Sequence, residues 1–245
     1  MMKRFLMALA FLLPSAAFAA GYSGPLDKAD YDLRDKASLQ RGAQIFMNYC
    51  LGCHTMQHQR YQRTFEDLGI PVDLGQELLQ FTGDGPGDFM VSAIDADASS
   101  DWFGLTPPDL TMVARVRGAD WLYTYFRSFY EDPSRPFGVN NEIFENVGMP
   151  HAVQELQGVP RRTYERRMVD GEMRDVYVGI RSDGSGRLSD EEFDQAMLDL
   201  TAFLVYTGEP MYLERQRMGY YVIGFLIVFL ILTILLKREY WRDIK

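Results

Sequence analysis

The two cysteines of this 245-residue chain stand three positions apart and are followed at once by a histidine, in the run Cys50-Leu51-Gly52-Cys53-His54. This spacing is the attachment motif of a c-type haem. Two thiols on the first turn of a helix can add to the two vinyl groups of one porphyrin, and the histidine that follows can bind the iron from the same face. The sequence therefore predicts one covalently bound haem c, with His54 as the first axial ligand.

A redox-active dithiol and half of a zinc site are the alternative interpretations of such a cysteine pair. A zinc site needs further cysteine or histidine ligands, and the chain offers only His58 and His151 elsewhere. A thioredoxin-like pair follows a strand, whereas residues 39–46 have helical periodicity. The sequence therefore favours haem over both alternatives.

The residue that fills the second axial position decides whether the iron only transfers electrons or also binds other ligands. Met149 is the favoured candidate, because Gly148 allows a close approach of the backbone and Pro150 holds Met149 extended. It is far enough along the chain from His54 to reach the opposite face of the ring. His151 and an open position remain as alternatives. A histidine and methionine pair would raise the reduction potential relative to two histidines.

Four further residues are candidates for supporting the haem. His54 is expected to donate its other ring N–H to the backbone carbonyl of Pro107 or Pro108. Arg115 and Arg117 are candidates for pairing with the haem propionates. The alternative for both arginines is a solvated charge on a helix.

Two apolar segments lie outside the expected core. Residues 1–19 have a short basic start, an apolar run and small residues at a cleavage site, which predicts a secretory signal peptide. Residues 218–236 contain no charged residue and are long enough to cross a bilayer as a helix. Basic and aromatic residues flank this run, as is typical of the two membrane interfaces.

These segments predict the order and the orientation of the domains. Export places residues 20–217 in the periplasm as the haem domain, residues 218–236 across the inner (cytoplasmic) membrane of a bacterium, and residues 237–245 in the cytoplasm. The formal net charge of the chain is -9, and both apolar segments with their flanks are net basic. The exported domain therefore has a more negative net charge than the whole chain. Such a domain is expected to bind a basic protein rather than a nucleic acid.

The exported domain is predicted to be mainly α, with loop and hairpin insertions and with both cysteines used by the haem rather than by a disulfide. Helical periodicity and capping residues predict helices at residues 38–50 (capped by Ser38), 110–117, 119–129 and from Ser189 to Glu209-Pro210. Residues 57–108 are expected to be mostly loop, with short helices only at 65–68 and near 87–94. Alternation over 174–180, with 163–168 as its partner, predicts a hairpin.

The ordered set of motifs resembles the cytochrome c1 family, the membrane-anchored haem subunits of quinol–cytochrome c reductase, or the cytochrome bc1 complex. The resemblance covers nearly the whole mature chain. It rests on Ser38-Leu39-Gln40-Arg41-Gly42 before Cys50-Leu51-Gly52-Cys53-His54-Thr55-Met56, on Pro107-Pro108-Asp109-Leu110, on Arg115-Val116-Arg117-Gly118, on Gly148-Met149-Pro150, and on Arg217-Met218-Gly219 before a single terminal span.

The resemblance implies a class I cytochrome c-like haem domain, His54 and Met149 as axial ligands, and Arg117 as the propionate partner. It also implies electron transfer from the Rieske iron–sulfur protein to a cytochrome c, in a dimeric complex with cytochrome b. The chain would then be an enzyme only as a subunit of the reductase. Some bacterial members tie down a loop with an extra cysteine pair that this chain lacks, so other contacts must hold residues 131–146.

Two other functions remain open. A membrane-tethered monohaem cytochrome could carry electrons to a terminal oxidase. A haem with an open iron position would instead indicate an enzyme or a gas-binding cytochrome.

Overall fold

The computed structural model describes residues 24–243, so the predicted signal peptide at residues 1–19 lies outside the described residues. The helices are α2 (Lys36–Ile45), the π-helix η1 (Phe46–Cys50), α3 (Tyr61–Leu68), α4 (Val72–Leu79), α5 (Ala96–Phe103), α6 (Val113–Arg117), α7 (Ala119–Arg127), α8 (Gln154–Gln157), α9 (Asp190–Gly208) and α10 (Tyr212–Tyr240). The strands pair as antiparallel ribbons: β1 (Met56–Arg60) with β2 (Phe89–Met90), β3 (Phe129–Glu131) with β4 (Val139–Asn141), and β5 (Pro160–Val169) with β6 (Glu172–Ser182). The described part of the chain is thus mainly helical, as the sequence predicts.

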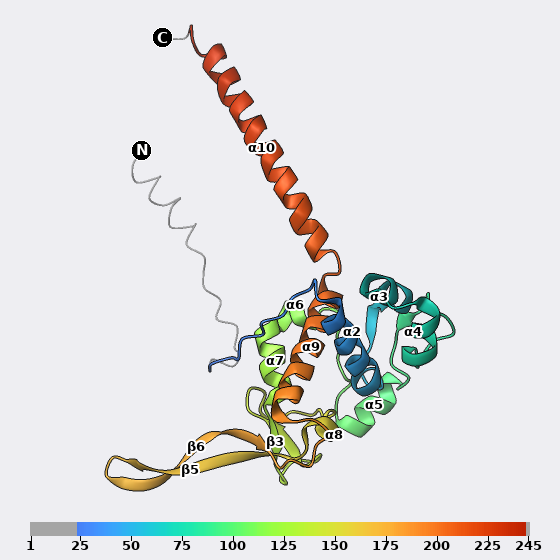
Figure 1. Ribbon diagram of the computed structural model, residues 1–245, viewed down its shortest axis with the longest axis vertical. Coiled ribbons are helices and arrows are strands. Elements are labelled where there is room, and N and C mark those ends of the chain that lie inside the picture. The colour runs from blue at the N-terminus through green and yellow to red at the C-terminus, as the bar shows by residue number, and fades with distance from the viewer. Residues whose placement is uncertain (1–23, 244–245) are drawn as a thin grey trace.

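The core forms where α2 and α7 pack on α9 (Figure 1). The start of α9 is the predicted capping box, in which Ser189 accepts from the backbone N–H of Glu192 and the Glu192 side chain accepts from that of Ser189. Phe46 and Phe203 are fully buried, with ring centroids 5.7 Å apart. Their contact joins the helix that leads to the cysteine motif to the long helix at the centre of the domain.

The contact between α2 and α9 depends on a glycine and a buried carboxylate. A Cβ on Gly42 would lie 2.1 Å from the backbone oxygen of Asp199, so only glycine allows this approach. The Asp199 carboxylate accepts from Ser38 Oγ at 2.6 Å and pairs with Arg41 Nε at 2.6 Å. The prediction that Ser38 caps the helix is therefore wrong, because Asp35 accepts from the Ser38 N–H and caps α2 instead.

The prediction that residues 57–108 are mostly loop is also wrong. They contain α3, α4 and α5, and the predicted helix near residues 87–94 is replaced by the short strand β2. These helices have eight residues each. Helices this short have too few turns for a clear apolar stripe and depend on tertiary packing. Here α4 packs through Gly75, where a Cβ would lie 2.7 Å from the ring of Phe65.

The predicted hairpin is confirmed and is longer than expected. Strands β5 and β6 turn at Asp170 and Gly171 and project from the body of the domain (Figure 1). The base of the hairpin is held by Arg162, whose guanidinium lies 3.8 Å from the centroid of the Tyr130 ring.

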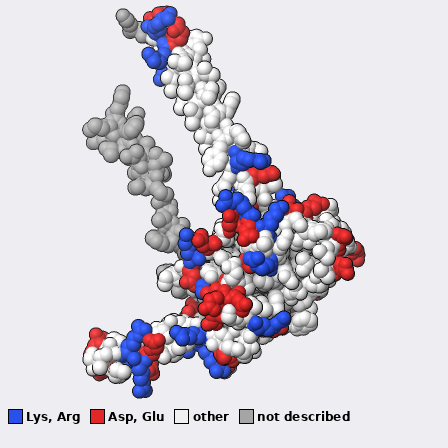
Figure 2. Space-filling view, viewed as in Figure 1, with Lys and Arg blue, Asp and Glu red and all other residues white. Residues whose placement is uncertain are grey.

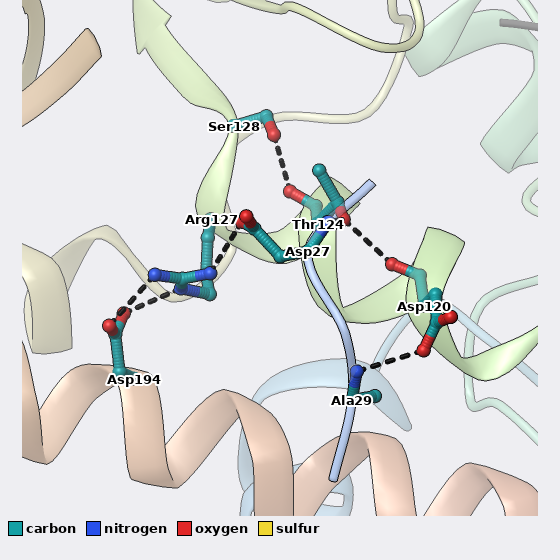
Figure 3. A network of polar contacts seen from close by, with 7 residues as sticks. All are labelled: Asp27, Ala29, Asp120, Thr124, Arg127, Ser128 and Asp194. Carbon is teal, nitrogen blue, oxygen red and sulfur yellow. Dashed lines mark hydrogen bonds and ion pairs between the residues drawn. The ribbon is translucent and has the colours of Figure 1, made fainter. Parts of the chain in front are cut away.

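The segment before α2 is anchored on α7 and, through Arg127, on α9. Two of its backbone N–H groups donate to side chains of α7 at 2.8 Å each (Figure 3). Arg127 completes the network, since it pairs with Asp27 of this segment at 2.6 Å and with Asp194 of α9 at 2.5 Å. The extended chain leading to α2 is thereby fixed against both helices.

Helix α10 leaves the domain and extends away from it (Figure 1). It is the described helix that is long and apolar enough to cross a membrane, and none of its residues is buried. Residues 218–236 of this helix carry no charged side chain, and charged residues lie at both ends of the run (Figure 2). The helix is continuous through residues 218–236, which the sequence assigns to the membrane.

Candidate haem site

The cysteine motif lies where the helical segment α2–η1 ends, and not on the first turn of a helix as the sequence analysis assumed. The His54 N–H donates to the Cys50 carbonyl at 2.8 Å, which closes a tight turn around Cys53. Both thiols are free. Burial raises the pKa of the Cys50 thiol to about 12 and also raises the pKa of Cys53. Both side chains are therefore thiols rather than thiolates at neutral pH.

His54 is oriented by the chain that precedes α6. Its Nδ1 lies 2.8 Å from the Pro108 carbonyl oxygen, and the ring is only 8% exposed. Because a carbonyl only accepts, Nδ1 carries the hydrogen and the lone pair of Nε2 is left free. Burial lowers the pKa of His54, against the opposing effect of this hydrogen bond. The imidazole is thus neutral, as a metal ligand must be.

Two backbone-directed contacts hold the Pro107–Pro108 segment beside the motif. The Leu110 N–H donates to the Thr55 carbonyl at 2.9 Å. The Gln57 N–H donates to the Asp109 carboxylate at 2.7 Å. These two hydrogen bonds therefore position the carbonyl that orients His54.

His54 and Met149 line the same pocket. Most of its remaining walls are apolar side chains: Tyr49, Cys53, Phe103, Leu105, Pro107, Pro108, Pro150 and Ala152, together with Gly148. A Cβ on Gly148 would lie 3.0 Å from Leu105 Cδ2, so the glycine lets the Met149 loop approach this wall closely. The pocket thus combines an apolar lining with two side chains that can bind iron.

Met149 is held from behind by α7. The Tyr125 hydroxyl donates to Met149 Sδ at 3.4 Å. Tyr125 itself is buried and stacks on Trp121, with ring centroids 4.9 Å apart and planes 11° from parallel. Burial raises the pKa of Tyr125, so the hydroxyl stays protonated and keeps its donor. The sequence predicts only that both aromatic residues lie on one helix, at residues 119–129.

Two asparagines hold the loop that precedes Met149. The fully buried Asn141 donates through Nδ2 to the Tyr125 carbonyl at 2.8 Å and accepts from the N–H groups of Ile143 and Phe144. Asn140 Oδ1 accepts from the Asn146 N–H at 2.9 Å. Asn146 has a φ of 61°, in the left-handed region that asparagine tolerates. These amides tether the loop before Met149, and no motif in the sequence predicted them.

The other candidate side chains, Arg117, Arg115 and His151, do not line the pocket. The Arg117 guanidinium lies 4.8 Å from the Trp121 ring centroid. Arg115 instead pairs with Glu209 at 2.6 Å, near the junction of α9 and α10. His151 is buried, stacks on Phe129 at 4.7 Å and places Nε2 2.6 Å from Gln157 Oε1. His151 is not among the residues that line the pocket.

Two methionines outside the pocket differ in burial. Met197 in α9 is fully buried, whereas Met112, which precedes the short helix α6, is 45% exposed.

These residues fit a c-type haem better than a metal ion alone. A neutral imidazole with a free Nε2, a thioether and the Cys53 thiol line one largely apolar pocket, and Cys50 lies three residues before Cys53. This set matches the donors and the covalent links that a haem requires. Among residues 24–243, no group of three or more His, Cys, Asp or Glu side chains could hold an ion by itself. The zinc alternative therefore finds no support in the described structure.

Fold and site together describe a mainly helical domain with a haem-type pocket and one membrane-length helix, the design of an anchored electron-transfer protein. The model of the cytochrome C1 family matches residues 84–244. The chain is 47% identical over 245 residues to cytochrome c1 of Allochromatium vinosum, covering all of both chains. The chain belongs to the cytochrome c1 family, whose members are haem-containing electron-transfer subunits of a respiratory oxidoreductase complex.

Two further relatives carry other names. The ammonia monooxygenase gamma subunit of Nitrosomonas europaea is 42% identical over 244 residues, with 99% of each chain covered. The cytochrome b/c1 of Bradyrhizobium diazoefficiens is 25% identical over 249 residues, which cover 91% of this chain and 35% of that one.

Proposed function

We propose that the chain carries one haem c linked to Cys50 and Cys53, with His54 and Met149 as axial ligands, in a class I cytochrome c-like domain. The observation that carries this proposal is the shared pocket, in which His54 is fixed with Nε2 free and Met149 is held by Tyr125. The haem, when bound, supplies reversible one-electron chemistry at its iron.

The residues of the chain set the conditions for that chemistry. The Pro108 carbonyl fixes the tautomer of His54 and raises its basicity as a ligand. The thioether of Met149 favours the reduced iron, and the apolar walls keep water from the site. Arg117 is the proposed propionate partner, whereas Arg115 is already paired with Glu209. The function of the site is thus to hold an iron of high potential, closed to other ligands.

The charge distribution supports a basic electron acceptor. Residues 64–114 contain ten acidic residues and no lysine or arginine. Four pocket-lining residues, Phe103, Leu105, Pro107 and Pro108, belong to this stretch. An acidic surface beside the haem site would steer a basic partner, such as a cytochrome c, to the place of electron transfer.

The proposed electron donor is a Rieske iron–sulfur protein, and the proposed third partner is cytochrome b in a quinol–cytochrome c reductase. The relative named cytochrome b/c1, in which this chain matches 35% of the length, supports an association with cytochrome b. The proposed orientation places residues 20–217 in the periplasm after removal of residues 1–19, with α10 in the inner membrane and residues 237–245 in the cytoplasm.

Affinity purification of the tagged full-length chain from detergent-solubilised membranes tests this function. Cytochrome b and the Rieske protein should copurify with it, and the preparation should reduce cytochrome c with quinol. Recovery of the haem protein without these partners would indicate the tethered monohaem cytochrome instead. A colourless product, or a pigment that acidified acetone extracts, would disprove covalent haem.

A further inference from the structure

An open groove of about 610 Å³ lies where the haem domain meets the first turns of α10. One wall is the segment before α2 and the other is the start of α10. We call it the junction groove, and its principal lining residues are Tyr31, Arg34, Tyr212, Gln216, Arg217 and Tyr220. The contacts of Asp27 and Arg127 fix the first wall on the domain (Figure 3). The groove is therefore bounded by ordered chain on both sides.

Most cations around this junction are neutralised by neighbouring carboxylates. Arg34 pairs with Asp32 at 2.9 Å. Arg115 and Arg215 both pair with Glu209. Arg217 differs from them, because no ion pair or hydrogen bond joins its side chain to any residue within 24–243. The junction groove therefore presents one uncompensated guanidinium, whose planar fork suits a phosphate.

The position of Arg217 matches the level of lipid headgroups. It directly precedes residues 218–236, which contain no charged side chain. At 3.6 residues per turn, Tyr220, Gly224 and Ile231 follow Arg217 along the same face of α10. Nothing lies within 4 Å of a Cβ built on Gly224, so this face of α10 is open one turn beyond Tyr220. A charged headgroup site thus continues directly into an apolar track.

We propose that the junction groove binds an anionic phospholipid of the leaflet that faces the haem domain. Its phosphate would lie on Arg217 beside the tyrosines, and an acyl chain would follow α10 past Tyr220 and Gly224. This inference rests on the proposed insertion of α10 in the membrane. The lipid would fix the angle between α10 and the haem domain, since it fills the space between the anchored segment and the helix.

Lipid retention by the full-length haem protein tests the proposal. The protein is placed in nanodiscs of phosphatidylcholine containing a minor share of phosphatidylglycerol, and the lipids retained after release are identified by native mass spectrometry. We expect phosphatidylglycerol to be enriched about tenfold over its share in the disc, as a charge-assisted contact implies. Arg217→Gln should abolish this enrichment, and Gly224→Leu should lower it without any change of charge.

Arg166→Gln is the matched control, because Arg166 is an exposed arginine on the hairpin and should leave the enrichment intact. The haem absorption spectrum reports whether each variant is folded. Equal enrichment in the wild type and Arg217→Gln would overturn the proposal. So would displacement of the lipid by inorganic phosphate, or a photo-crosslinker at Gln216 that captures protein and no lipid in native membranes. Loss of the wild-type chain from the membrane fraction would instead overturn the proposed anchoring.

Discussion

The Tyr125 hydroxyl donates to Met149 Sδ over 3.4 Å and so connects helix α7 to the proposed iron ligand. Tyr125 is in turn fixed by stacking on Trp121 and by the Asn141 side chain, which donates to the Tyr125 carbonyl. The sulfur is thus positioned by the buried core rather than by its own loop alone.

Tyr125→Phe should lower the reduction potential of the haem. A hydrogen bond donated to the sulfur withdraws electron density and favours the reduced iron, and such a bond contributes about 1 kcal/mol, or about 40 mV for one electron. Redox titration of the purified protein measures the shift. Tyr123→Phe is the control, since Tyr123 is on the same helix, contacts Arg127 and does not line the pocket. Equal shifts in both variants would contradict the role of Tyr125.

Met149→Ala should open the second axial position of the iron. The ferric protein should become high-spin, bind carbon monoxide when reduced, and lose the weak far-red band of methionine bound to iron. Absorption spectroscopy checks all three changes. Met112→Ala, at an exposed methionine, should change none of them. A far-red band that survives in Met149→Ala would mean that another residue is the ligand.

Asn141→Ala should loosen the loop that carries Met149. The substitution removes a donor to the Tyr125 carbonyl and an acceptor for two backbone N–H groups in a fully buried site. We expect the free energy of unfolding to fall by about 2–3 kcal/mol, with a weaker methionine band. Chemical denaturation followed by the haem spectrum measures both effects. Asn48→Ala removes an exposed asparagine and should cost less than about 0.5 kcal/mol.

Asp199→Ala should destabilise the packing of α2 on α9. It leaves Ser38 and the Arg41 guanidinium without their buried acceptor. Because Arg41 is half exposed, we expect a loss of about 2–3 kcal/mol, less than for a fully buried pair. Thermal and denaturant unfolding measure the loss. Glu191→Ala, on the exposed first turn of α9, should have little effect, and a similar loss there would contradict the prediction.

Asp183 should contribute to the acid sensitivity of the domain. Hydrogen bonds from Ser185 and from the Val159 N–H lower the pKa of this carboxyl to about 2. A carboxyl with a lowered pKa stabilises the fold above its unfolded pKa of about 3.9, and the contribution is lost as the pH falls toward 2. Asp183→Asn should therefore flatten the fall in stability between about pH 4 and pH 2. Asp30→Asn, at a largely exposed carboxylate, should leave that slope unchanged.

The elements that the sequence predicts correctly are those with local causes. The capping box of Ser189 and Glu192 depends on two residues three positions apart, and the strands of the hairpin alternate along their own length. The family resemblance, now confirmed, depends likewise on short ordered motifs. Helices α4 and α5 were missed, and α3 was predicted only over residues 65–68, because eight residues carry too little periodicity to stand out from a segment rich in glycine and aspartate.

The sequence by itself determined the proposed attachment motif of Cys50, Cys53 and His54 and the membrane-length helix, because haem attachment and bilayer thickness each require a fixed local pattern. Only the tertiary structure decided that Pro108 rather than Pro107 orients His54 and that Arg115 forms an ion pair with Glu209. It also decided that Asn141 and Tyr125 hold the Met149 loop. The physical reason is that each of these contacts joins residues far apart along the chain. Such partners are selected by the packing of helices, which leaves no periodic trace in the sequence.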